Sequence, residues 1–129
     1  IADATGKRIA AQGLKTVVLL GTKFTMEKDF YKKKLAEDYG IGTLIPNADQ
    51  REAVHNIIYE ELVKGKIREA SRDTFKAIIA GLAQRGAEGV ILGCTEIPLL
   101  ISSEDVEIPV FDTTRLHVEE VVAWAMDQP

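Results

Sequence analysis

The sequence contains one cysteine, Cys94, and the residues around it are suited to proton transfer. Cys94 follows a run of apolar residues and precedes Thr95 and Glu96. If that run is a buried strand and a helix starts after it, the backbone N–H groups and the helix dipole there favour the thiolate. The same N–H groups and the Thr95 hydroxyl can bind a carboxylate, which suits chemistry at the α-carbon of a carboxylic acid. The alternative is a free cysteine that packs as a small hydrophobe.

Two other polar segments are expected at the same edge of the fold. Residues 21–25 and 112–114 each follow an expected strand, and ligands of open α/β sheets bind beyond the carboxyl ends of the strands. We therefore expect Thr22 to line a site together with the Cys94 segment. Thr25 could also line the site, but its position just before Met26 favours the N-cap of a following helix, and Asp112 has the same two interpretations.

Short β-branched runs alternate with longer segments of helical periodicity, which is the pattern of βαβ units. Two of these runs are almost continuously apolar, as strands buried on both faces of a parallel sheet are. The sequence therefore predicts an α/β fold, an open doubly wound parallel sheet of about four strands with helices on both faces. The expected strands are residues 16–20, 42–45, 89–92 and 108–111, and three of the expected helices are residues 3–12, 26–39 and 114–126.

Two further helices have chemically marked ends. Asp49 and Glu52 form a capping-box pattern, so a helix is expected from there to about Lys64, with Gly65 as its C-terminal glycine. The next helix ends at Gly86 and carries an apolar stripe that must pack on the sheet. The stripe consists of Phe75, Ile78, Ile79 and Leu82. In an earlier expected helix, the three consecutive lysines 32–34 are expected to be solvated.

Composition restricts the class of protein. With 129 residues, 46% apolar and 28% charged, the chain is expected to form one domain with its own core. The net charge of −4 and the interspersed charges argue against a nucleic-acid partner. No apolar run has the length of about 20 residues that a membrane helix needs, and no signal peptide is recognisable, so we expect no membrane partner and a cytoplasmic location.

The remaining special residues add no metal site. His55 and His117 fall within expected helices, and we interpret both as structural or solvated and away from the three polar segments. A single cysteine cannot form an internal disulfide. The sequence begins with Ile1 rather than Met, which we interpret as a sign of a truncated chain or a piece of a longer protein. The oligomeric state stays open, and a homodimer is compatible with the sequence.

Four segments resemble a known family. The string Val-Ile-Leu-Gly-Cys-Thr-Glu-Ile-Pro-Leu-Leu at residues 90–100 is similar to the second cysteine motif of the aspartate/glutamate racemases. Residues 1–5 resemble the inter-domain segment of that family, residues 20–26 the strand and loop that follow it, and residues 110–114 its last strand and loop. The resemblance therefore extends over nearly the whole chain.

This resemblance implies an isomerase that acts on a small acidic amino acid without a cofactor. Family members have two similar α/β domains, and each domain contributes one cysteine to a site between them. One thiolate removes the α-proton while the opposing thiol returns a proton to the other face, without pyridoxal phosphate or metal. By this resemblance residues 1–129 are the second domain together with the final strand and helix. The N-terminal domain with the first cysteine is then the missing partner, and this chain alone cannot racemise amino acids.

The resemblance also suggests roles for individual residues. Cys94 would be the second cysteine, and Thr95 with the adjacent N–H groups would hold the substrate α-carboxylate. Lys64 matches in type and rough position a family lysine that contacts the side-chain carboxylate, with Lys66 and Lys23 as alternatives. Glu96 stands where glutamate racemases have histidine, which indicates the aspartate or broad-specificity branch, and it can orient Cys94 or simply stabilise a first helical turn.

Two rival interpretations remain. Related enzymes use the same cysteine position for maleate isomerisation, hydantoin racemisation or arylmalonate decarboxylation. A flavodoxin-like binding domain with an inert Cys94 would be a non-catalytic alternative. Thiol reactivity separates them, because a catalytic Cys94 is expected to be alkylated faster than an ordinary thiol at mildly acidic pH, whereas a buried structural one is not.

Overall fold

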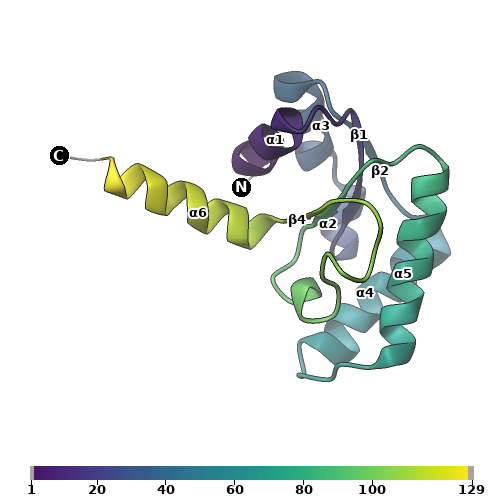
Figure 1. Cartoon of the computed structure of the whole chain (residues 1–129). Helices are drawn as coiled ribbons and strands as arrows, with labels where there is room; N and C mark the ends of the chain where they lie inside the picture. Colours follow the sequence, from purple (N-terminus) through teal and green to yellow (C-terminus); the bar gives the residue numbers. More distant parts are fainter. Residues whose placement is uncertain (1, 128–129) are drawn as a thin grey trace.

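The computed structural model describes residues 2–127 as a four-stranded parallel sheet covered by helices on both faces (Figure 1). The strands are β1 (Thr16–Leu20), β2 (Gly42–Leu44), β3 (Val90–Leu92) and β4 (Val110–Asp112), in the order β2-β1-β3-β4. The helices are α1 (Ala2–Ala11), α2 (Lys23–Glu27), α3 (Asp29–Tyr39), α4 (Ala48–Ile57), α5 (Glu69–Gln84) and α6 (Thr113–Met126). A π-helical turn, η1 (Ile58–Leu62), extends α4, and a 3₁₀ turn, η2 (Ile97–Leu99), follows β3. The predicted fold class is confirmed.

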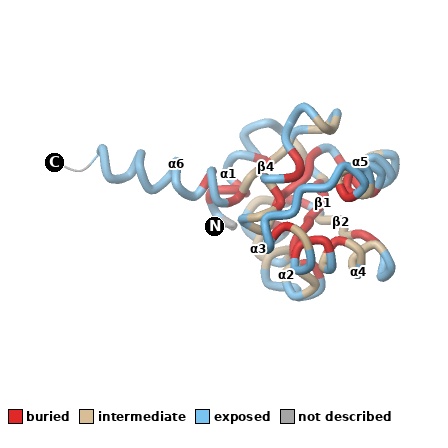
Figure 2. The backbone as a smooth tube through the Cα atoms, turned by 90° about the horizontal axis from the view of Figure 1, so that it is seen from below, coloured by how far each residue is buried: buried red, intermediate tan, exposed pale blue. Residues whose placement is uncertain are grey.

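Alternate residues of the buried strands face two separate parts of the core. Val18 and Leu20 of β1 point to the side covered by α4, η1 and α5, whereas Val17 and Leu19 point to the side covered by α1 and α3. All four side chains are inaccessible to solvent. Figure 2 shows this buried centre of the backbone enclosed by exposed helices and loops. Burial on both faces explains why β1 was predictable from its apolar run, residue for residue.

Two local predictions were wrong. The expected helix 26–39 is two helices, because Lys28 adopts an extended conformation (φ −79°, ψ 145°) between α2 and α3. The capping box is formed by Asn47 and Gln50, two residues before the predicted pair. The Asn47 side chain accepts from the Gln50 N–H at 2.8 Å and the Gln50 side chain accepts from the Asn47 N–H at 3.0 Å. Both pairs fit the capping pattern, and only the backbone geometry decides between them.

Helix α6 extends away from the rest of the molecule in both views (Figures 1 and 2). Its first half is tied to α1 by ion pairs between Arg8 and Glu119 and between Lys7 and Glu120. Its apolar side chains beyond that point are at least half exposed or nearly so: Val118, Val121, Val122, Trp124 and Met126. A helix face of this kind, left in solvent, indicates a surface that another part of a protein covers.

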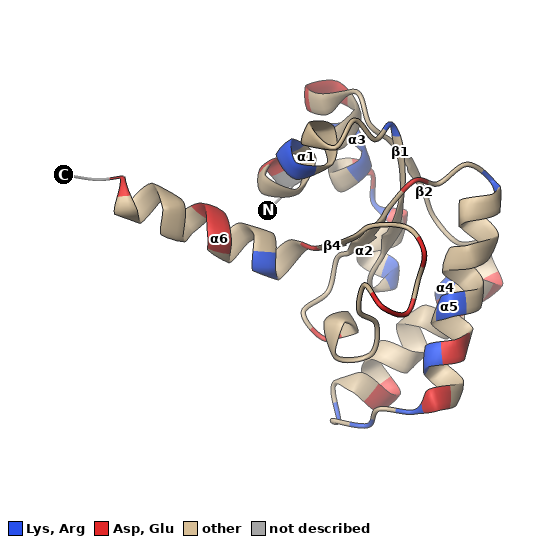
Figure 3. Ribbon diagram, viewed as in Figure 1, with Lys and Arg blue, Asp and Glu red and all other residues tan. Residues whose placement is uncertain are grey.

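Charged residues are mixed in sign over the surface. Figure 3 shows acidic and basic residues interspersed along α4 and α5, so this view contains no large face of one sign. Within residues 2–127, no helix is long and apolar enough to cross a bilayer.

Candidate active site

Three loops meet at the carboxyl edge of the sheet, as predicted. The parallel register pairs Leu20 with Leu92 and Leu92 with Asp112, so the last residues of β1, β3 and β4 are aligned. The loops after them are also bonded to one another. The Gly93 N–H donates to the Leu20 carbonyl at 2.8 Å, and the buried Thr113 hydroxyl donates to the Leu92 carbonyl at 3.1 Å. The Cys94 loop is therefore held between its two neighbours.

Cys94 is half-buried at this edge and has a defined partner. Its thiol donates to Oε2 of Glu96 at 3.0 Å, and the Thr95 hydroxyl donates to the same oxygen at 2.8 Å. Three of the predicted site residues, Cys94, Thr95 and Glu96, therefore form one hydrogen-bonded group. Because the Glu96 carboxylate accepts the hydrogen bond from the thiol, it fixes the direction of the S–H bond and lies where it can exchange that proton.

The electrostatic effect on Cys94 is opposite to the one expected. Burial raises the pKa of the Cys94 thiol, and the hydrogen bond to Glu96 raises it further. Backbone N–H groups of Glu96 and Ile97 lie close enough to the sulfur to lower its pKa, but they do not outweigh these effects. The expectation assumed a full helix after Cys94, whereas only the short turn η2 follows. The resting group is therefore the thiol, and the same hydrogen bonds lower the pKa of Glu96.

A cavity of about 590 Å³ opens beside the Cys94 loop. Residues from all three loops line it, namely Thr25, Gly93, Thr95, Thr113 and Thr114. Its remaining lining comes from α1 and α3: Asp3, Phe30, Tyr31 and Lys34. Four threonines supply hydroxyl groups that can bind the polar atoms of a small substrate.

Sequence reasoning missed the contribution of α3 to this cavity. Lys34 was expected to be solvated, but it lines the cavity and forms ion pairs with Asp38 at 2.9 Å and with Asp3 at 3.8 Å. Tyr31 is half-buried, and its hydroxyl donates to Thr5 at 3.4 Å. No local motif marks these residues, because they reach the site only through the packing of α3 next to α1.

Of the other predicted residues, Thr25 lines the cavity, whereas Thr22, Asp112 and Lys64 do not. Thr22 is the N-cap of α2, and its hydroxyl accepts from the Thr25 N–H at 3.4 Å. The N-cap assignment of Thr25 was therefore wrong, and Thr25 lines the cavity instead. Asp112 caps α6 by accepting from the Arg115 N–H at 3.1 Å. Lys64 is exposed in the turn after η1, pairs with Glu60 at 3.5 Å and is outside the cavity lining.

His55 lies close to the first loop, contrary to expectation. Its Nδ1 accepts a hydrogen bond from the Lys23 N–H at 3.0 Å. The helix was predicted correctly at this position, but its orientation relative to α2 was not predictable from periodicity. Among residues 2–127, no group of three His, Cys, Asp or Glu side chains is placed to hold a metal ion.

Gly93 is required by the close contact between the β3 and β1 ends. A Cβ atom at this position would lie 2.9 Å from the Leu20 carbonyl oxygen and 3.3 Å from Cγ2 of Thr25. We expect Gly93→Ala to lower the free energy of unfolding by about 1–3 kcal/mol, measured by urea denaturation. Gly81→Ala is the matched control, since a Cβ there meets nothing within 4 Å and alanine favours the helix. Equal stability of the two variants would contradict this account of Gly93.

Comparison with known proteins identifies the family of this site. The model of the family Asp/Glu/Hydantoin racemase matches residues 1–121. This chain belongs to that family. The segments that meet at the carboxyl edge of the sheet in this chain are the same segments whose sequences resemble this racemase family.

Solved structures support the membership. A proposed Asp/Glu racemase from Yersinia pestis is 46% identical, with a TM-score of 0.93 over 98% of this chain and 55% of its own. An aspartate racemase homologue from Pyrococcus horikoshii OT3 is 38% identical, with a TM-score of 0.91 over the same shares. This chain thus spans about half the length of these two proteins. An uncharacterised protein of Pectobacterium carotovorum subsp. carotovorum is 31% identical over 96% of this chain and 82% of its own.

Proposed function

We propose that this racemase-family chain supplies one of two thiols to a cofactor-independent racemase for a small acidic amino acid such as aspartate or glutamate. The observation that carries the proposal is the thiol of Cys94, bonded to Glu96 at the sheet edge, beside a threonine-lined cavity. The family and the names of the two solved relatives support a racemase acting on aspartate or glutamate. The family name also covers hydantoin racemisation, whereas the names of the two solved relatives mention only aspartate and glutamate; maleate and arylmalonate chemistry has support from neither.

In one direction of the racemisation, Cys94 acts as the proton donor. An opposing thiolate takes the α-proton of the substrate, and the electron pair of the C–H bond stays on the α-carbon as a carbanion. The Cys94 thiol then gives its proton to the other face of that carbon. The products are the inverted amino acid, a neutral opposing thiol and a Cys94 thiolate. The raised pKa of Cys94 suits this role, because a donor must be protonated before substrate binds.

Glu96 and the backbone control the thiol in both directions. In the resting state the Glu96 carboxylate accepts the thiol hydrogen bond and orients the proton. After proton transfer, the N–H groups of Glu96 and Ile97 are the groups that stabilise the thiolate. The thiolate can then remove the α-proton of the opposite enantiomer, so the reaction runs both ways without a second base in this domain.

The substrate is proposed to bind with its α-carboxylate at the Thr95 side of the cavity. The Thr95 hydroxyl donates to Glu96 in the free protein and has to turn towards the substrate to bind it. Thr22 is hydrogen-bonded to Thr25 and acts indirectly, because it caps α2 and thereby holds the loop that carries Thr25. Lys64 is proposed to contact the side-chain carboxylate, with Lys23 and Lys66 as alternatives; none of the three lines this cavity in the free chain, and Lys64 is paired with Glu60.

The second thiol is proposed to come from a preceding domain. A single base that touches one face of the α-carbon returns the proton to the side from which it came, so inversion needs a group on each face. The two solved relatives contain a further 45% of chain beyond the region matched here, which leaves room for such a domain. The exposed apolar face of α6 offers it a surface to pack on.

Exchange of the substrate α-proton tests the proposal. The protein that contains this chain together with its preceding domain is incubated with L-aspartate or L-glutamate in D₂O, and NMR follows loss of the α-proton signal while chiral chromatography follows the D-isomer. Both are expected to proceed without added cofactor. Absence of exchange with either amino acid would contradict the proposed function.

The pH dependence of Cys94 alkylation should reveal the effect of Glu96. Because a raised pKa keeps the thiol protonated, the alkylation rate of wild type should rise at a higher pH than that of an unperturbed thiol. This replaces the sequence-based expectation of fast alkylation at mildly acidic pH, so slow alkylation at that pH does not by itself separate a catalytic Cys94 from a structural one. Glu96→Gln removes the negative charge next to the sulfur, so the midpoint should move to lower pH while the effect of burial remains. Iodoacetamide kinetics between pH 6 and about pH 10 measure the midpoint. Glu104→Gln, at an exposed loop position, is the control, and an upward or absent shift in the Glu96 variant would contradict the assignment.

A further inference from the structure

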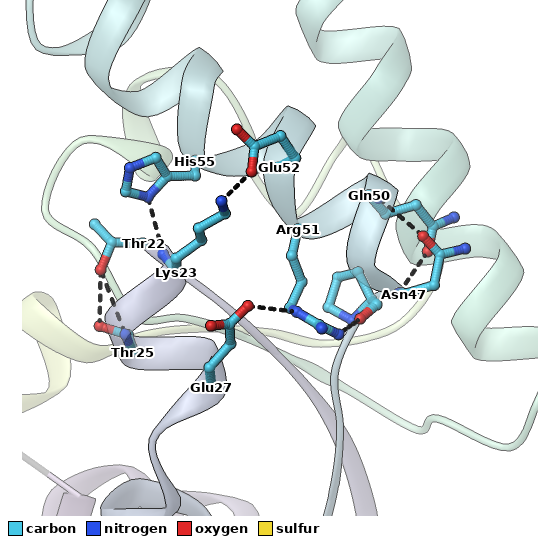
Figure 4. A network of polar contacts seen from close by, with 10 residues as sticks. Thr22, Lys23, Thr25, Glu27, Asn47, Gln50, Arg51, Glu52 and His55 are labelled. Carbon is cyan, nitrogen blue, oxygen red and sulfur yellow. Dashed lines mark hydrogen bonds and ion pairs between the residues drawn. The ribbon is translucent and has the colours of Figure 1, made fainter.

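Helix α2, which carries the first loop of the site, is held at both ends by α4 (Figure 4). At its start, the Lys23 ammonium pairs with Glu52 and the Lys23 N–H bonds to His55. At its end, Glu27 pairs with Arg51 at 3.1 Å. Arg51 also donates to the Pro46 carbonyl at 2.6 Å, which ties this contact to the chain before α4. The three residues of α4 lie on one face and meet α2 along its full length.

Of these contacts between α2 and α4, the one from the Lys23 N–H to His55 is a hydrogen bond, whereas the others are ion pairs. A backbone N–H can only donate, so Nδ1 of His55 is the acceptor in this bond. The ring is half-buried, and it lies against Tyr59 of η1 with ring centroids 4.7 Å apart. The Lys23 N–H belongs to the first turn of α2, where no carbonyl within the helix can accept it. His55 therefore supplies the partner that this N–H would otherwise lack.

The opposite side of the same loop touches the Cys94 loop. Thr22 and Thr25 are joined through their hydroxyls at 3.3 Å, and Thr25 lines the cavity. Thr25 lies close to Gly21, which follows β1, and to Gly93, which follows β3. A Cβ atom added to Gly21 would lie 3.1 Å from Thr25, and one added to Gly93 would lie 3.3 Å from it. A shift of α2 must therefore displace the segment that carries Cys94.

We propose that His55 is a positioning residue that fixes the 22–25 loop against the Cys94 loop through its bond to the Lys23 N–H. The effect of His55 on turnover rests on the proposed function, whereas its effect on the position of the 22–25 loop does not.

Two substitutions separate the hydrogen bond from simple packing. His55→Leu removes the acceptor but keeps an apolar side chain. His55→Asn keeps an acceptor, because Oδ1 of asparagine is attached to Cγ as Nδ1 of histidine is, and it does not titrate. Tyr59→Leu is the matched control, since it removes the ring contact and leaves the Lys23 bond in place. Amide hydrogen exchange at Lys23 and the iodoacetamide rate of Cys94 are measured in the 129-residue chain, with circular dichroism as the check of folding.

In His55→Leu, Lys23 exchange and Cys94 alkylation should each be about two- to tenfold faster, the effect of losing one hydrogen bond. His55→Asn and Tyr59→Leu should stay near wild type. The proposal is overturned if His55→Leu resembles wild type, or if all three variants change alike. If His55→Leu does not fold, His55→Phe, which also lacks an acceptor and keeps an aromatic ring beside Tyr59, takes its place in the same comparison.

Turnover in the two-domain protein then separates the two proposals. If racemisation occurs, His55→Leu should lower kcat more than it changes KM, and His55→Asn should restore kcat. If wild type shows no racemisation, the proposed function fails while the exchange and alkylation results still decide the role of His55.

Discussion

Replacing Cys94 by alanine in the two-domain protein is expected to lower the rate of racemisation by about 10³-fold or more, the usual scale for loss of an acid/base or nucleophilic group that no neighbour replaces. In our mechanism Cys94 is the group that reaches one face of the α-carbon. Without it, a carbanion formed by the opposing thiolate can be protonated only on the face from which the proton left. The D-isomer should therefore not accumulate from the L-isomer.

The same variant should still catalyse part of the reaction. The opposing thiolate can remove the α-proton of one enantiomer and return deuterium from solvent with retention. We expect slow exchange into that enantiomer and none into the other, followed by NMR in D₂O. Cys94→Ser, which preserves the shape of the side chain, serves as the fold control. Racemisation within tenfold of wild type in either variant would exclude Cys94 from the proton-transfer step.

The buried parts of the fold were the most predictable. β1 runs over the residues expected from its apolar sequence, and the other three strands are displaced by no more than two residues at either end. Strands with both faces in the core need apolar side chains at every position, so their sequences contain a strong signal. The meeting of three loops at one edge followed from parallel pairing alone.

Features that depend on local alternatives were less predictable. The residues around α4 contain two capping patterns, and the backbone uses the Asn47 pair rather than the Asp49 pair. The segment after Cys94 forms a 3₁₀ turn in which the Leu100 N–H bonds to the Ile97 carbonyl at 2.8 Å, where the start of a helix was expected. Burial of Cys94 and its hydrogen bond to Glu96 raise the pKa of the thiol, which is opposite to the expected direction.

Contacts between distant helices were not predictable at all. Lys34 reaches the cavity and His55 reaches the first loop because of how α3 and α4 are placed on the sheet. Periodicity identifies which face of a helix is apolar, but it does not show which polar residue lies at the edge of that face beside another element. The site core was therefore predictable from Cys94, Thr95 and Glu96, whereas the residues that surround it were not.

The 129 residues alone are expected to show no measurable racemisation of aspartate or glutamate, whereas the protein with its preceding domain should racemise at least one of them. The physical reason is that the sequence contains no second cysteine for the opposite face of the substrate. Chiral chromatography of the product, with equal concentrations of the two proteins, measures the difference.

The apolar face of α6 provides a second readout of the same assembly. The proposed preceding domain, expressed separately and added to this chain, is expected to bind there and to shift the emission of Trp124, which is 65% exposed in this structure, towards the blue. Val121→Lys should weaken this binding, because burying a lysine ammonium in an apolar contact is costly. Val63→Lys is the matched control, since Val63 is about as exposed as Val121 but lies in the turn after η1. Fast racemisation by the isolated chain would contradict the role proposed for the second thiol, and equal binding by both lysine variants would contradict the role proposed for the α6 surface.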